Sequence, residues 1–266
     1  MKKKLVGWEE AILKVLEKHN GKATLKEIYN DVPKLIQETK AKNIEHNIRG
    51  YLRRLKTVKS SIKQIGLSTY AFTDYQAENN LFEQITNKSI SKETDAGTDW
   101  KAKLEKAKVH SFIQGCLIEL GNFNGYQTYT PDKNAVFNGV KLSELIDFPS
   151  LPKFTYNDIM KIVDRIDVIW LKDRFPIRTF DVENSTDFSK ALLRAYQLRF
   201  FKAKFILVAD ISKKDIFENR VNMEPFVKIK KNVYFQSYDD VYQLYKSAAL
   251  NNKLNKKSKI FYGNYG

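Results

Sequence analysis

The chain has 266 residues, of which 42% are hydrophobic and 13% are aromatic. This length and composition can build one large domain or two small ones, and they exclude an intrinsically disordered protein. The formal net charge of +15 favours an anionic partner such as nucleic acid, a membrane surface or an acidic protein, although a lysine-rich composition that serves only solubility is the alternative.

A single cysteine, Cys116, lies among apolar residues and is predicted to fill the core. It excludes a disulfide framework within the chain and favours a reducing compartment. No apolar run is long enough to cross a membrane, and Glu9, Glu10 and Lys14 interrupt what would be the apolar part of a signal peptide. A cytoplasmic location without a membrane partner is therefore expected.

Residues 1–75 predict a small helical domain. Apolar residues recur at helical spacing over 8–19, and Thr24 with Glu27 forms a capping box at the start of a second helix. A third helix is predicted from about 43 to 55. Three short helices in succession indicate a compact module.

Two strand signals, 61–65 and 68–73, flank Gly66-Leu67 and predict a hairpin after the third helix. Three short helices and a terminal hairpin resemble a winged helix-turn-helix, which implies that the third helix enters the major groove of double-stranded DNA. Polar and basic side chains on its outer face are suited to base edges and phosphates, namely Lys42, Asn43, His46, Asn47, Arg49, Arg53 and Arg54. Residues 1–75 hold 16 Lys and Arg against 8 Asp and Glu, a net charge of +8. A module for protein contact, or a solvated basic face, is the alternative interpretation.

Residues 76–100 are polar and weakly patterned, and they predict a linker. The remaining residues, 101–266, alternate between helix and strand patterns. Helices are predicted at about 101–120, 155–163, 189–200 and 238–250, and strands at 126–130, 167–171, 177–183, 205–209 and 233–235. This order predicts an α/β (α+β) core with a mixed central sheet, interrupted by an irregular insertion at 131–156.

Three acids lie at the ends of two predicted neighbouring strands. Asp167 opens one strand, and Asp181 and Glu183 end the next. Because residues i and i+2 of a strand point to the same face, Asp181 and Glu183 share a face, and Asp167 joins them if the strands pair. Carboxylates that lie close together repel one another unless a strong positive charge compensates them. Oxygen ligands favour Mg²⁺ or Mn²⁺ over zinc as that charge. The alternative is that these acids cap strand ends in solvent.

The order of elements and the spacing of the acids resemble the PD-(D/E)xK nuclease superfamily, which has a restriction-endonuclease-like fold. Asp167 matches the first acid of that family and Asp181 the second, whereas Glu183 stands where the family usually has lysine. The resemblance implies a metal-dependent endodeoxyribonuclease of the type II restriction endonuclease kind, sequence-specific or modification-dependent, that uses Mg²⁺ (or Mn²⁺). Cleavage of both strands needs two active sites or two successive nicks, and a homodimer would supply the two sites.

The resemblance points to further site residues. Either Glu183 activates the attacking water through a metal ion or another water, or Lys190 of the next helix leans back into the site. Glu119 is a candidate fourth metal ligand, with a solvent-facing position as the alternative, and Arg194 is a candidate phosphate contact. His110 is a candidate for a phosphate contact or for a structural role.

Two rival functions remain open at this point. Loss of the lysine is also typical of a degenerate nuclease fold, which would serve a non-catalytic DNA-binding regulator. A structure-selective repair nuclease would instead cut branched or single-stranded DNA without fixed sites.

Overall fold

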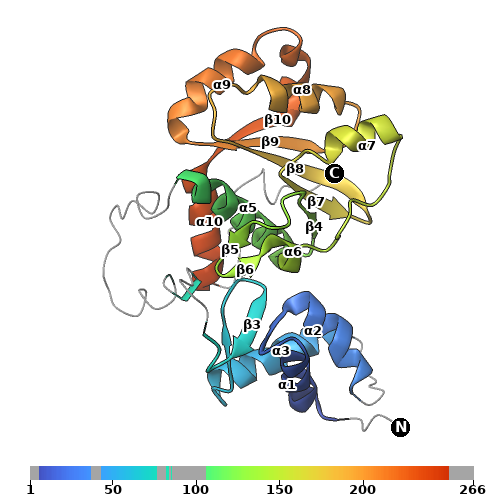
Figure 1. The fold of residues 1–266 in the computed structure, drawn as a ribbon, viewed down its shortest axis with the longest axis vertical. Coiled ribbons are helices and arrows are strands. Elements are labelled where there is room, and N and C mark those ends of the chain that lie inside the picture. The colour runs from blue at the N-terminus through green and yellow to red at the C-terminus, as the bar shows by residue number, and fades with distance from the viewer. Residues whose placement is uncertain (1–5, 37–42, 77–81, 84, 86–105, 252–266) are drawn as a thin grey trace. The chain divides into compact units, whose positions relative to one another are not determined.

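The structure is a computed structural model that describes residues 6–36, 43–76, 82–83, 85 and 106–251. The chain forms two compact units, Met1–Asn87 and Lys88–Gly266 (Figure 1). Most of the predicted linker, the start of the helix predicted at 101–120 and the DNA-binding candidate Lys42 lie outside the described residues. Of the helices described, none combines the length and hydrophobicity that crossing a lipid bilayer requires.

The first unit contains three helices around one apolar core. These are α1 (Trp8–Lys18), α2 (Leu25–Asp31) and α3 (Ile44–Thr57), and a short 3-10 turn, η1 (Val32–Lys34), follows α2. Each helix buries one apolar face, and the core includes Ile12, Leu16, Ile28, Ile48 and Leu52. The predicted capping box of Thr24 and Glu27 is present at the start of α2.

Three short strands complete the first unit. The predicted hairpin forms from β2 (Ile62–Gln64) and β3 (Thr69–Phe72), and β1 (Lys22–Thr24) pairs with the other side of β3. The sheet is antiparallel with the order β1-β3-β2. β1 was not predicted, because three residues are too few to show a strand alternation.

The second unit is built on a five-stranded mixed sheet in the order β10-β9-β8-β7-β4 (Figure 1). Its strands are β4 (Gln127–Tyr129), β7 (Val168–Lys172), β8 (Phe175–Glu183), β9 (Lys204–Ala209) and β10 (Val233–Ser237). β8, β9 and β10 are parallel, whereas β7 is antiparallel to both β8 and β4. The predicted α/β class with a mixed central sheet is confirmed.

Helices cover both faces of this sheet (Figure 1). One face carries α5 (Lys106–Phe123) and α10 (Tyr238–Asn251), and the other carries α7 (Asn157–Val163), α8 (Ser189–Gln197) and α9 (Lys214–Val221). Successive side chains of β7 point to opposite faces of the sheet, so this strand packs against the helices on both faces. Ile169 packs in one core cluster with Ala191 and Leu192 of α8, whereas the next residue, Trp170, donates its Nε1–H to the carbonyl of Leu117 in α5 at 3.0 Å.

Two regions of the second unit differ from the sequence prediction. The segment predicted as irregular contains a small hairpin, β5 (Val136–Phe137) with β6 (Val140–Lys141), and the short helix α6 (Leu142–Leu145). Two 3-10 segments, η2 (Ile211–Lys213) and η3 (Phe226–Asn232), flank α9. α9 itself was not predicted, because it buries only Phe217 and Val221 and shows little apolar periodicity.

Gly115 allows α5 to pack directly on Phe137. A Cβ atom at position 115 would lie 2.1 Å from Phe137 Cγ, so the ring would have to move. Gly115→Ala is therefore expected to destabilise the second unit by about 1–3 kcal/mol, which calorimetry should detect as a lower melting temperature. Combined with Phe137→Leu, the loss should be smaller than the sum of the two single losses. An unchanged melting temperature in Gly115→Ala would contradict this packing.

Candidate active site

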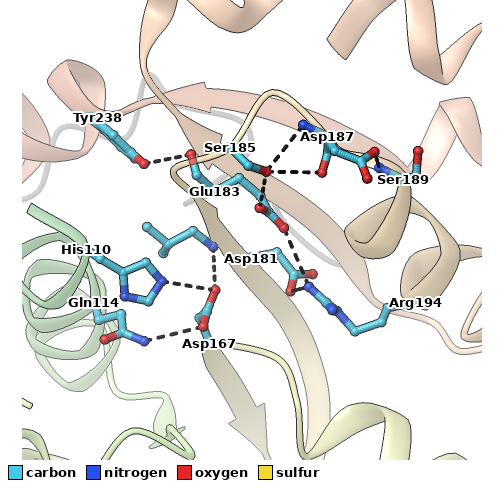
Figure 2. A network of polar contacts seen from close by, with 11 residues as sticks. His110, Gln114, Asp167, Asp181, Glu183, Ser185, Asp187, Ser189, Arg194 and Tyr238 are labelled. Carbon is cyan, nitrogen blue, oxygen red and sulfur yellow. Dashed lines mark hydrogen bonds and ion pairs between the residues drawn. The ribbon is translucent and has the colours of Figure 1, made fainter. Parts of the chain in front are cut away.

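The three predicted acids meet at one edge of the sheet in the second unit (Figure 2). Asp167 directly precedes β7, and Asp181 and Glu183 lie at the end of β8. The antiparallel register pairs Val168 with Phe180, so the next position outward places Asp167 opposite Asp181. Strand pairing therefore brings together carboxylates that are well separated in the sequence.

Asp167 is held from two directions. Its Oδ2 accepts a hydrogen bond from the backbone N–H of Val182 at 2.7 Å. On the other side, Gln114 Nε2 of α5 donates to Asp167 Oδ1 at 3.5 Å, and His110 Nε2 lies 3.6 Å from Oδ2 (Figure 2). His110 and Gln114 are one helical turn apart, so a single face of α5 positions both groups against Asp167.

Arg194 of α8 supplies the counter-charge for the other two acids. Its Nη2 donates to Asp181 Oδ1 at 2.5 Å and lies 3.7 Å from Glu183 Oε1. Asp181 is buried, with an exposed fraction of 5%. Within the described residues, the buried Arg194 Nε and Gln114 Oε1 have no hydrogen-bond partner. The protein therefore leaves polar atoms on both sides of the acids unsatisfied.

The pKa values show that burial disfavours the ionised forms of two of the acids, and like charge adds to this effect. Burial raises the pKa of Asp181 to about 7, and the charges of Asp167 and Glu183 add to this rise although Arg194 opposes it. Burial also raises the pKa of Glu183, again against the effect of Arg194. Burial lowers the pKa of His110, but its hydrogen bond and charge interaction with Asp167 outweigh burial and raise this pKa overall. One guanidinium does not fully compensate the three carboxylates.

The three acids fit a divalent cation by residue type but not by their present spacing. Carboxylate oxygens are the ligands that Mg²⁺ and Mn²⁺ prefer. In the part of the chain that the structure describes, no three His, Cys, Asp or Glu side chains are grouped closely enough to hold a metal ion. In this arrangement the Arg194 guanidinium, and not a ready-made cluster of ligands, balances Asp181 and Glu183.

Of two other candidates from the sequence, Glu119 is directed away from the acids and Lys190 is exposed. Glu119 follows His110 by nine residues, which is two and a half helical turns, so it lies on the opposite side of α5. It is buried, and its Oε2 accepts a hydrogen bond from the Tyr245 hydroxyl at 2.6 Å. Lys190 is exposed on α8. Hydrogen bonds with Ser189 lower the pKa of Asp187, and the charge of Lys190 makes a smaller contribution in the same direction. Arg194, one turn further along α8, reaches the acids instead.

The DNA-binding candidates of the first unit fall into two groups. Asn43 caps α3, since its Oδ1 accepts the backbone N–H of His46 at 2.9 Å. Arg49 donates to the Tyr29 hydroxyl at 2.5 Å, and Arg54 Nε lies 3.3 Å from Glu9 Oε1. These side chains have a structural partner in the unit. The remaining described candidates are the exposed His46 and Arg53 and the half-buried Asn47.

Three further polar residues were not identified from the sequence. Gln114 could have been found, because it is a polar residue one turn after His110 in an otherwise apolar stretch of helix. The Tyr238 hydroxyl donates to the carbonyl of Glu183 at 2.8 Å, and Lys213 Nζ donates to the carbonyl of Asn184 at 2.5 Å. Tyr238 and Lys213 carry no sequence signal, because only the parallel alignment of β8, β9 and β10 brings them near Glu183.

Comparison with known proteins identifies the class. Residues 52–260 match a family model of restriction enzymes, so this is a restriction-enzyme-like protein. The model describes the type II restriction enzyme NmeDI C-terminal domain, and because it covers more than half of the chain, the chain belongs to this family. The matched segment includes Asp167, Asp181, Glu183 and Arg194. No curated protein and no solved structure gave a match.

The raised pKa of Asp181 is expected to make stability depend on pH. The folded-state pKa is about 7 against a reference value of 3.8, so between these values the folded state retains a proton that the unfolded state releases. The resulting stabilisation is complete below pH 3.8 and is lost as the pH rises to about 7. Asp181→Asn cannot titrate, so between about pH 5 and pH 7 the wild type should lose stability relative to this variant.

Denaturant midpoints measured in the presence of a chelator test this pH dependence. Asp158→Asn, which changes an exposed carboxylate, is the matched control and should follow the wild type. Parallel pH profiles for the wild type and Asp181→Asn would show that Asp181 does not hold the proton.

Proposed function

We propose that this chain is a type II restriction endonuclease-like enzyme that hydrolyses DNA phosphodiester bonds with Mg²⁺ or Mn²⁺ at a PD-(D/E)xK site. The observation that carries this proposal is the convergence of Asp167, Asp181 and Glu183 at one sheet edge, within the segment that matches the restriction-enzyme family. Buried carboxylates with raised pKa values oppose folding, and such groups are typical of functional sites.

The three acids are proposed to have separate tasks. Asp167 and Asp181 would hold the metal ion, and Glu183 would complete or orient its ligands. Such an ion would supply a Lewis acid for a phosphoryl oxygen and a lower pKa for the attacking water. Glu183, whose raised pKa favours proton uptake, accepts the proton that this water releases. Glu183 thereby takes the role of the lysine that members of the PD-(D/E)xK superfamily usually carry at this position.

Two side chains are proposed to contact the scissile phosphate. Arg194 has an unsatisfied Nε–H within the described residues, and phosphate oxygens offer the acceptors that a guanidinium binds well. His110, whose pKa is raised by Asp167, is the second candidate and approaches from α5. Gln114 acts as a positioning residue because it holds Asp167. Exposed Lys190 is a candidate for a flanking phosphate.

The first unit is proposed to be a winged helix-turn-helix module that binds a specific sequence in double-stranded DNA. The order of three helices followed by the β2–β3 hairpin supports this assignment, and so does the net charge of +8 in residues 1–75. A homodimer, located in the cytoplasm, would cut both strands in one encounter.

A non-catalytic DNA-binding regulator is the rival function. Glu183 in the place of lysine favours it, as does the ion pair that occupies Asp181 in this structure. A structure-selective repair nuclease is the other alternative. Digestion of methylated and unmethylated genomic DNA, followed by sequencing of the ends, distinguishes these functions: fixed ends indicate a restriction enzyme, and their dependence on methylation indicates which kind.

Cleavage of plasmid DNA tests the assigned residues. The wild type should give discrete fragments with Mg²⁺ and none with a chelator. Asp167→Asn and Asp181→Asn should each reduce the cleavage rate by at least about a hundredfold, because each removes a proposed metal ligand. Both variants should still shift DNA in a gel, since the first unit is unchanged.

Two controls accompany this experiment. Asp158→Asn changes an exposed carboxylate of the same unit, and Glu119→Gln changes the acid that bonds to Tyr245; both should cleave within a few-fold of the wild type if folded. Cleavage at the wild-type rate by Asp181→Asn would reject the proposed site.

A further inference from the structure

α3 contains a glycine on its exposed face that the described structure does not require. Gly50 lies in the middle of this 14-residue helix and is exposed. A Cβ atom built on Gly50 meets nothing within 4 Å among the described residues. Its backbone is helical and not among the positive-φ glycines described. Glycine is one of the least favourable residues in a helix interior, so neither packing nor backbone geometry in the unit explains this choice.

The surroundings of Gly50 indicate which partner the absent side chain accommodates. Three and four residues away along α3 lie Asn47, His46, Arg53 and Arg54, so polar and basic groups surround the glycine on both sides. Among the described residues, the side chains of His46 and Arg53 have no hydrogen-bond or ion-pair partner. A surface with a bare backbone in its centre and donors around it complements a polyanion that approaches closely.

We propose that α3 approaches duplex DNA most closely at Gly50, and that the absence of a side chain there lets His46, Asn47 and Arg53 reach base edges and phosphates. This inference rests on the proposed function and adds a specificity-determining position to it. The side chains of Arg49 and Arg54 contribute charge from the flanks while they contact Tyr29 and Glu9.

The inference predicts opposite effects of one substitution on folding and on binding. Gly50→Ala should raise the melting temperature of the first unit by about 3–6 °C, because alanine favours the helix and meets no neighbour. The same variant should bind the cleaved sequence at least about tenfold more weakly than the wild type, because the methyl group holds α3 away from the DNA. The slope of affinity against salt concentration should not change, because no charge is removed.

Calorimetry and fluorescence anisotropy on the full chain measure both effects, with a duplex that contains the sequence cut by the wild type. Asn30→Ala is the matched control, because it also replaces an exposed, uncharged, poor helix former by alanine, but on α2. It should raise the melting temperature and leave DNA affinity unchanged. Arg53→Gln should weaken binding and reduce the salt slope by about one.

Each other outcome has a defined meaning. A lower melting temperature of Gly50→Ala would show that the glycine serves the fold, and unchanged affinity would show that DNA does not approach there; either result overturns the inference. If the wild type itself neither binds nor cuts DNA, the proposed function fails first.

Discussion

Repulsion among three carboxylates is the constraint around which the second unit is arranged. The antiparallel pairing of β7 with β8 places Asp167 opposite Asp181, and strand alternation adds Glu183 to the same side. The hydrogen bonds of the sheet thus hold like charges together, and burial, with a smaller contribution from the neighbouring acids, raises the pKa of Asp181. The remaining polar groups at this edge respond to that charge.

The two helical layers divide this compensation between them. α5, on one face of the sheet, presents His110 and Gln114 to Asp167, and α8, on the other face, presents Arg194 to Asp181. Both helices bury apolar side chains: Ala191 and Leu192 of α8 lie in the core cluster, and Ile113 and Leu117 of α5 are buried. The acids are therefore positioned by the sheet, whereas the groups that contact them come from helices on both of its faces.

Sequence patterns were sufficient for the class of fold and for the placement of the acids at neighbouring strand ends, because periodicity and strand alternation are local properties. The expected grouping around a metal ion is not found among the described residues. They were insufficient wherever the rotation or exact start of a helix decides the outcome. Glu119 belongs to the expected helix but points away from the acids, and Asn43 caps α3 because the helix starts one residue later. The ion pair between Arg194 and Asp181 depends on how α8 packs on the sheet, which no local pattern encodes.

Each unit contains a residue that folding alone would not favour. Folding alone would favour a neutral side chain at position 181, where burial disfavours a charge, and a larger residue at position 50, where the helix has room for one. Other local choices agree with the fold, as in the capping box of α2 and the apolar strand β9 of the sheet. Sites where a sequence departs from what its fold prefers are expected to be those that face a partner. Two such departures are a concentration of acids in the second unit and a missing side chain among basic residues in the first, and they are the positions at which the proposed partners would bind.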